Sequence, residues 1–267
     1  MSGHERHYTT NIQKGGALIR ECRILLLEWL PTESIDQFLE RVSAQNVLGK
    51  LSRRRVRDIV KRIFKPRFTA TGTPGAMPVR RLLESGVAPA VVDRVFYYHT
   101  ALADHLLYDF AGEFLNRKHS QGGYGVSITE AEEFLLRLQR SGQFDRPWSP
   151  ATRTKVARGL LAACRDFHVL EGAVRKHLAP VALPMEVFVY VAYYLKERVV
   201  SASRMIEHPD WRLFFLNHRD VEHMFLRAHQ EDWLKYNAAG HVVRVDWHFS
   251  NHMEAVDALA QRAHSYA

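Results

Sequence analysis

The sequence predicts a mainly α, multi-helical globular protein with helix-turn-helix-like motifs and one or two small β-hairpins. Apolar residues recur at helical spacing through most of the 267 residues. Hydrophobic residues make up 46% of the chain and aromatic residues 11%, which is enough to bury a core and excludes wholesale disorder. Proline and glycine residues separate the periodic segments, and only two short segments have the pattern of a hairpin.

Three amphipathic helices are expected in the first seventy residues: Ala17–Leu30, Ser34–Gln45 and Arg53–Lys65. Ser34 and Gln37 have the spacing of a capping box at the start of the second helix. Ser52 can cap the third helix in the same way. Pro66 is expected to end it, because proline lacks an N–H group and clashes with the preceding turn.

The middle of the chain predicts one long helix and then a linker. The helix starts at Pro89 and can run to about Asn116. Asn116–Ser127 is polar, contains three glycines and has no periodicity, so it is expected to be a connection between domains. We therefore expect two packed helical domains, residues 1–120 and residues 121–267.

Six further helices are expected in the second half: Thr129–Arg140, Thr152–Phe167, Met185–Val199, Trp211–Leu216, Asp220–Asp232 and a terminal helix capped by Ser250. Thr129 and Glu132 have capping-box spacing. His168–Val181 is compatible either with a short hairpin that turns at Glu171-Gly172 or with a short helix. The residues on both sides of Asn237–Gly240 alternate in polarity and predict a hairpin.

Cysteine content and hydropathy indicate a cytoplasmic protein. Cys22 and Cys164 lie 142 positions apart, which excludes a disulfide scaffold and a zinc site built from cysteines. Met1–Gln13 is polar and lacks the apolar core of a secretory signal. The longest apolar run, Val187–Leu195, has nine residues, whereas a membrane-spanning helix needs about 20. We expect no membrane association, and a monomer.

Positive charge is concentrated near the N-terminus. The 37 lysine and arginine residues exceed the 29 aspartate and glutamate residues, so the formal net charge is +8. Residues 1–80 hold 15 basic and 7 acidic residues, whereas residues 81–267 hold 22 of each. The whole excess therefore lies in the first third of the chain. Such an imbalance is typical of a surface that faces a polyanion.

The most basic segment has eight basic residues and one acid, Asp58; the basic residues are Arg53, Arg54, Arg55, Arg57, Lys61, Arg62, Lys65 and Arg67. At 100° per residue, several of them share a helix face opposite the apolar stripe, where they can contact phosphates or guanine edges. The preceding helix gives a helix-turn-helix arrangement with the basic helix second, the position that enters the major groove. The connection is longer than the usual turn of about 3–4 residues. The alternative is an ordinary solvated basic face.

A second basic cluster is formed by Arg153, Lys155 and Arg158 on the Thr152–Phe167 helix. This helix follows Thr129–Arg140, so the pair can form a second helix-turn-helix. If the next segment is a hairpin, its basic residues would make the motif winged. An ordinary amphipathic helix explains the pattern equally well.

No catalytic or metal-binding motif is present in the sequence. It has no Walker A motif, nucleophile elbow, dinucleotide fingerprint or acidic nuclease cluster. Among the 15 histidines, His248 and His252 have i, i+4 spacing but no glutamate between them and no cysteine companion. We therefore expect no enzyme activity, no bound metal and no cofactor.

Four stretches are informative when they are taken in order: Tyr8–Glu21, Tyr108-Asp109-Phe110, Asp166–Gly172, and His208–Arg212 leading to the Gly240–Trp247 hairpin. In this order and spacing they resemble the BrxA family of BREX (bacteriophage exclusion) defence systems. The resemblance implies a mainly α protein with helix-turn-helix motifs beside positive surfaces, which binds double-stranded DNA and has no catalytic activity of its own. It also implies work beside a methyltransferase, an ATPase and other BREX components. The family offers no catalytic residues to transfer.

Together these observations predict a non-enzymatic double-stranded DNA-binding accessory protein of a BREX system. Its DNA-binding residues would be those of Arg53–Arg67 and, on the second helix, Arg153, Lys155 and Arg158. Two alternatives remain open. One is a protein-interaction adaptor within the defence complex, and the other is an RNA-binding regulator.

Overall fold

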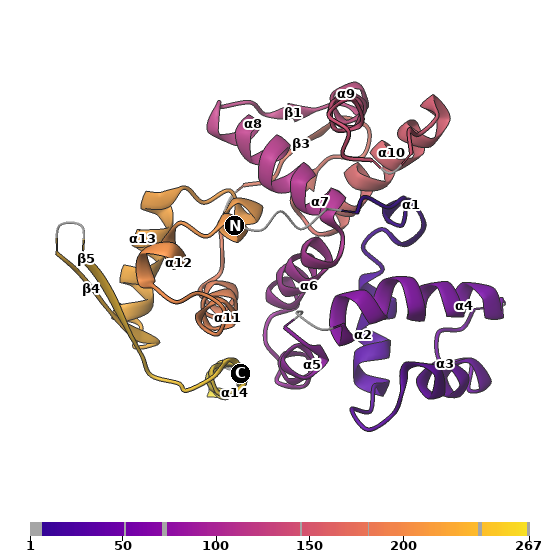
Figure 1. Cartoon of the computed structure of the whole chain (residues 1–267). Coiled ribbons are helices and arrows are strands. Elements are labelled where there is room, and N and C mark those ends of the chain that lie inside the picture. The colour runs from indigo at the N-terminus through magenta and orange to yellow at the C-terminus, as the bar shows by residue number, and fades with distance from the viewer. Residues whose placement is uncertain are drawn as a thin grey trace. The chain divides into compact units, whose positions relative to one another are not determined.

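The computed structural model describes residues 7–50, 52–70, 74–144, 146–180, 182–239 and 242–265 (Figure 1). This part of the chain is mainly helical, with one three-stranded and one two-stranded antiparallel sheet. The mainly α prediction is therefore confirmed. Among these residues, no helix has the length and apolar character needed to cross a bilayer.

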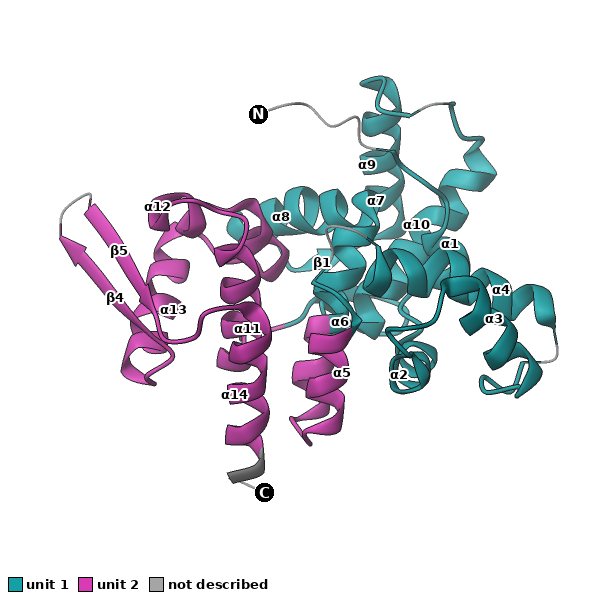
Figure 2. Ribbon diagram, turned by 60° about the horizontal axis from the view of Figure 1, so that its bottom comes forward, with its two compact units in different colours: residues 1–76, 96–179 teal, residues 77–95, 180–267 magenta. Residues whose placement is uncertain are grey.

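The chain forms two compact units, each built from two separate stretches of sequence (Figure 2). Unit 1 contains residues 1–76 and 96–179, and unit 2 contains residues 77–95 and 180–267. This division differs from the boundary expected near residue 120. The segment predicted to be a linker, Asn116–Ser127, lies inside unit 1 and contains a helix and a strand. The strand pairs with residues about fifty positions later, and polar composition cannot reveal such a partner.

Eight α-helices of the described residues lie wholly within unit 1. They are α1 (Ile12–Gly15), α2 (Ile19–Glu28), α3 (Ile35–Ala44), α4 (Arg53–Ile59), α7 (His105–Asp109), α8 (Asn116–Ser120), α9 (Ile128–Arg140) and α10 (Pro150–Asp166). Two π-helical segments, with hydrogen bonds from i to i+5, extend α4 and α7: η1 (Val60–Thr69) and η2 (Phe110–Leu115). The strands are β1 (Gly125–Val126), β2 (Leu170–Glu171) and β3 (Lys176–Leu178), in the order β1-β3-β2.

Unit 2 is built around α11 (Met185–Lys196), whose side chains are buried along most of its length. Its other elements follow in chain order: α5 (Ala76–Glu84), the start of α6 (Pro89–Ala103), α12 (Ala202–Ile206), the 3₁₀-helix η3 (Pro209–Phe214), α13 (His218–Gln230), β4 (Leu234–Ala239), β5 (Val242–Trp247) and α14 (His252–Ser265). Helix α6 continues into unit 1. The predicted C-terminal hairpin is confirmed, although its turn, residues 240–241, lies outside the described residues.

Most of the aromatic residues of the second half lie in the core of unit 2. Phe188 stacks on Trp211 with 5.0 Å between ring centroids and meets Phe225 edge-on at 5.0 Å. Trp211 donates its indole N–H to the carbonyl of Met205 at 2.7 Å, so its polar group is satisfied inside the core. These rings are packing residues rather than exposed platforms for bases.

Two predicted helix boundaries are wrong for local reasons. The helix predicted from Pro89 to Asn116 is interrupted because Asp104 has extended backbone and its carboxylate accepts the N–H groups of Leu106 and Leu107. Aspartate competes with helix continuation in this way and caps the next helix instead. The capping box of α9 uses Ser127 and Glu130, two residues before the predicted pair.

Pro66 does not end the basic helix. The backbone stays helical through it to Thr69, in the wider π-helical form. Phe64 and Phe68 lie on either side of Pro66 and are both fully buried, with their rings 5.5 Å apart. Tertiary packing of these rings therefore outweighs the local preference of proline.

The aromatic core of unit 1 fixes the position of the basic helix. Trp29 meets Phe38 edge-on at 5.0 Å, and Phe38 packs against Phe64 at 5.3 Å. The chain of rings continues through Phe68 to Phe96 at 5.6 Å. These contacts join α2, α3, η1 and α6, so the apolar side of the basic segment is held on the core and its polar side faces solvent.

Candidate nucleic-acid interface

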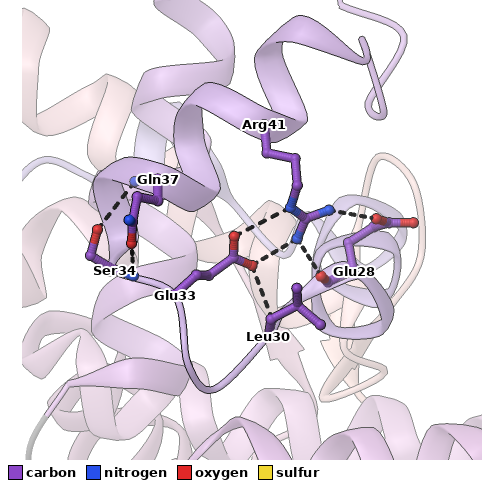
Figure 3. Close-up of polar contacts among 6 residues, drawn as sticks. All are labelled: Glu28, Leu30, Glu33, Ser34, Gln37 and Arg41. Carbon is purple, nitrogen blue, oxygen red and sulfur yellow. Dashed lines mark hydrogen bonds and ion pairs between the residues drawn. The ribbon is translucent and has the colours of Figure 1, made fainter.

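Helix α3 is tied to the end of α2 by a network around Arg41 (Figure 3). The Arg41 guanidinium contacts Glu33 Oε1 at 2.7 Å and Glu28 Oε2 at 3.0 Å, and it donates to the Glu28 carbonyl at 2.6 Å. Hydrogen bonding to Arg41 lowers the pKa of Glu33. Ser34 and Gln37 form the predicted capping box, which is confirmed. The turn between α2 and α3 therefore has a defined shape.

Helix α4 has the two faces that its sequence predicts. Ser52 caps it by accepting the Arg55 N–H, and Val56 and Ile59 point into the core. On the opposite side, six of the eight predicted basic residues are exposed: Arg53, Arg54, Arg57, Lys61, Arg62 and Lys65. The basic face predicted for this segment therefore exists along α4 and the first turns of η1.

Some of these cations already have acidic partners. Lys61 Nζ lies 2.6 Å from Asp36 of α3, and Arg62 pairs with Asp58 at 3.2 Å. Hydrogen bonding to Lys61 lowers the pKa of Asp36. A groove of about 550 Å³ separates α3 from α4 at this point, with the Asp36 and Glu40 side chains on the α3 wall. The basic face therefore has an acidic border on one side.

Four exposed cations of the segment form no salt bridge among the described residues: Arg53, Arg54, Arg57 and Lys65. Arg53 and Arg57 line the groove beside α3. Unpaired guanidiniums on a solvent-facing helix can donate two hydrogen bonds each to a phosphate. They are the strongest candidates for polyanion contact in this segment.

Arg67 is not part of the exposed face, so this part of the predicted site is wrong. Its side chain is 5% exposed and donates to the carbonyls of Gly16 and Ala17, both at 2.7 Å. The prediction counted Arg67 with its basic segment, but at 100° per residue this position lies on the side of the apolar stripe and not on the basic face. Arg67 therefore fastens the start of α2 to η1.

Arg55 also has a structural contact. Its Nη1 donates to the carbonyl of Lys14 at 2.8 Å, which ties the basic helix to α1. Helix α1 also lies against α10 (Figures 1 and 2). A Cβ atom on Gly159 of α10 would stand 2.9 Å from Gln13 Cα, and one on Gly15 would overlap Ile63. Glycine at these two positions allows α1 to contact both basic helices closely.

The second basic cluster, on α10, also contains both exposed residues and a residue with a structural contact. Ser149 caps α10 and Pro150 occupies its first turn. Arg153 is half-buried and donates to the Trp148 carbonyl at 2.6 Å. Lys155 and Arg158 are exposed and have no ionic partner among the described residues. Two of the three predicted residues are thus available to a ligand.

The segment His168–Val181 is a hairpin, not a helix, in its described part. β2 and β3 pair with Leu170 opposite Leu178, and the loop between them carries Arg175. β1 adds a third strand, with Gly125 opposite His177. β1 has no recognisable sequence signal, because two residues are too few to show alternation. Along the chain the order is β1, α9, α10, β2, β3.

The difference in net charge between the two units is larger than the difference between the first 80 residues and the rest of the sequence. Unit 1 holds 25 basic and 16 acidic residues, a net charge of +9, whereas unit 2 holds 12 and 13, a net charge of −1. All the excess positive charge therefore belongs to the unit that contains α4 and α10. In the described part of the chain, no three His, Cys, Asp or Glu side chains gather closely enough to share a metal ion.

The comparisons with known proteins identify the family. The BrxA family model matches residues 6–194, which is more than two thirds of the chain. The chain belongs to the BrxA family. BrxA proteins belong to BREX phage-defence systems, so this protein is a BREX-associated defence protein. Of the four resembling stretches, His208–Arg212 and its following hairpin lie beyond the matched residues.

A solved structure is similar to this BrxA-family chain. The crystal structure of an uncharacterized protein from Magnetospirillum magneticum has a TM-score of 0.59 and 18% sequence identity. The similarity covers 78% of this chain and 97% of that chain. At this identity it shows a shared fold. The comparison with curated proteins gives no significant match.

Two stretches of the BrxA resemblance meet in unit 1. The Tyr8 hydroxyl donates to Asp109 Oδ2 at 2.5 Å and lies 2.8 Å from Gln143 Oε1. Asp109 is 1% exposed. The N-terminal stretch of the family thus fastens α1 to α7 as well as to α4 and α10, and its residues have a structural role in holding these helices together.

Proposed function

We propose that this BrxA-family protein binds double-stranded DNA as a non-enzymatic accessory of a BREX system. The observation that carries the proposal is the concentration of all excess positive charge in unit 1, with unpaired cations on α4 and α10. Its other partners would be BREX components, and it would act in the cytoplasm.

The order of elements supports this proposal. α3 and α4 form one helix pair with the basic helix second, and α9 and α10 form another. The second pair is followed by a hairpin in a sheet ordered β1-β3-β2, which is typical of a winged helix-turn-helix. In such motifs the second helix enters the major groove. The connections between helices are longer than a standard turn, as the sequence predicted.

Phosphate neutralisation would supply most of the affinity. The exposed cations that would contact phosphates are Arg53, Arg54, Arg57 and Lys65 on the first basic segment and Lys155 and Arg158 on α10. If about 4–6 phosphates are neutralised, log affinity should fall against log salt with a slope of about −4 to −5. Arg67, Arg55 and Arg153 would support the surface through their backbone hydrogen bonds.

A fluorescence-anisotropy titration of labelled duplex DNA at several salt concentrations tests the proposal. We expect a steep negative salt slope, and a loss of at least tenfold in affinity in the triple variant R53A/R54A/R57A. Its thermal unfolding should stay close to that of the wild type, because these side chains face solvent. A flat salt response in the wild type would contradict the proposal. Competition with duplex RNA and with single-stranded DNA distinguishes double-stranded DNA binding from the RNA-binding alternative.

One observation favours an additional adaptor role. Unit 2 has a net charge of −1, so it has no excess positive charge that would attract a polyanion. It would then contact protein components while unit 1 binds DNA. Co-purification with a BREX component that persists after nuclease treatment would support this role, and loss of the component on nuclease treatment would argue against it.

A further inference from the structure

A cleft in unit 1 lies between α10 and the β2–β3 hairpin. Its volume is about 800 Å³, and Val126, Ile128 and Leu161 contribute apolar side chains to it. Arg158 enters from α10, and Arg175 enters from the hairpin loop. The cleft thus combines apolar walls with two guanidiniums that come from the two flanking elements.

The other two cations at the cleft already have partners. Lys118 forms an ion pair with Glu130, and Lys176 Nζ donates to the Ala173 carbonyl at 3.1 Å. Arg158 and Arg175 are exposed, and neither has an ionic partner among the described residues. These two guanidiniums are therefore the free donors of the cleft. Guanidinium groups bind phosphate oxygens in a forked geometry.

The hairpin loop presents an apolar residue beside Arg175. Val174 is 95% exposed, so its side chain contacts almost nothing in unit 1. The loop is tightly folded at Gly172, where φ is +90° and a Cβ atom would stand 2.0 Å from the Arg175 carbonyl oxygen. A tightly folded loop therefore presents the exposed side chain of Val174 next to Arg175. An exposed apolar side chain of this kind suits contact with the apolar walls of a minor groove.

We propose that one strand of the duplex crosses unit 1 at this cleft. Arg158 and Arg175 donate to phosphates of that strand from its two sides, and Val174 reaches the adjacent minor groove. This placement rests on the proposed function. When α10 lies in the major groove, the DNA strand beside it forms the boundary between the major and the minor groove. The hairpin then lies on the minor-groove side of that DNA strand.

The test compares single variants of the full chain in the salt titration of duplex DNA. R158A and R175A should each weaken binding about five- to tenfold and reduce the salt slope by about one, because each removes one phosphate contact. The matched control is R212A, which removes an equal charge from an exposed position in unit 2. All three variants should unfold at the wild-type temperature.

The outcomes separate this inference from the proposed function. If the wild type binds duplex DNA with a steep salt slope but R175A behaves like R212A, the cleft is not crossed by a strand, while the proposed function stands. If the wild type does not bind duplex DNA, the proposed function itself fails.

The minor-groove placement has its own variant. V174D should weaken binding about tenfold or more, because its carboxylate would lie near phosphates, whereas V174S should lose little. V174D that binds duplex DNA like the wild type would overturn the placement of the hairpin. Since Val174 is almost fully exposed, neither change should alter folding.

Discussion

Arginines that look equivalent in the sequence have different tasks in unit 1. Arg54 and Arg57 face solvent, whereas Arg67 is buried and bonded to two carbonyls. The amphipathic pattern identified the exposed arginines correctly. It could not identify the role of Arg67, because the carbonyls that it binds lie about fifty residues earlier in the chain.

Replacement of Arg67 by methionine tests this distinction. It leaves the Gly16 and Ala17 carbonyls without their donor, and an unsatisfied buried acceptor costs about 1–3 kcal/mol. We expect the free energy of unfolding to fall by about 2–4 kcal/mol in a urea titration. The duplex affinity of the folded variant should change less than twofold. A variant that is as stable as the wild type but has lost DNA binding would contradict this structural role and indicate that Arg67 contacts DNA.

His99 predicts a pH dependence of stability. Its Nδ1 lies 2.9 Å from the Arg67 carbonyl, which can only accept, so Nδ1 carries the proton. Burial lowers the pKa of His99 from 6.5 to about 4, so the folded protein holds the ring neutral. The unfolded chain binds a proton below pH 6.5, and stability from this group is therefore full above pH 6.5 and is lost between pH 6.5 and 4.

The size of this effect is about 3 kcal/mol over the whole window, from the difference between the two pKa values. Urea unfolding of the wild type at pH 7 and pH 5 should therefore show a loss of stability. In H99N, whose amide can still donate to the Arg67 carbonyl, the loss between these pH values should be smaller. An unchanged difference would assign the pH dependence to other groups.

At the scale of elements, caps and apolar periods predicted most helices, because both are local. Ser34 with Gln37 and Ser52 mark helix starts that the structure confirms, and the helix predicted from Thr152 begins two residues earlier, at Pro150. The predicted helix boundaries were wrong where a distant contact, or a side chain that hydrogen-bonds to the nearby backbone, determined the backbone conformation. Pro66 stays helical between buried rings, and Asp104 breaks a long apolar run.

The close contact between α1 and α10 depends on Gly159. In an open helix, alanine in place of glycine stabilises by about 1 kcal/mol. Here the new Cβ atom would stand 2.9 Å from Gln13 Cα, so α1 must move. We expect G159A to lower the free energy of unfolding by about 1–3 kcal/mol in a urea titration. In the control G125A the Cβ atom meets nothing, so stability should stay within about 0.5 kcal/mol.

The acidic border of α3 should weaken DNA binding by α4. Asp36 lies 2.6 Å from Lys61, so it occupies a cation that a phosphate could otherwise use. D36N keeps the shape of the side chain and removes its charge. We expect duplex affinity to rise about two- to threefold at low salt and the gain to shrink as salt screens the pair. Since the pair is exposed, unfolding should change little, and lower affinity in D36N would place the DNA away from this groove.

At the scale of the whole molecule, the sequence showed that positive charge is uneven but misplaced its boundary. Residues 1–80 carry a net charge of +8, and the rest of the chain appeared neutral. Unit 1 joins residues 1–76 to residues 96–179 and reaches +9, leaving −1 in unit 2. A linear count could not find this division, because α6 carries the chain between the units and β1 pairs with a later strand.

The division of charge leads to a test with two triple variants of equal charge change. R53A/R54A/R57A removes three exposed cations from unit 1, and R204A/R212A/R219A removes three from unit 2. If duplex binding depends only on net charge, both variants should lose the same affinity. If it depends on the surface of unit 1, the first should lose at least tenfold and reduce the salt slope by about three, while the second stays within about twofold. Anisotropy titrations at three salt concentrations distinguish these results, and thermal unfolding of both variants controls for folding. Equal losses in the two variants would mean that binding is a property of overall charge and that α4 is not a site.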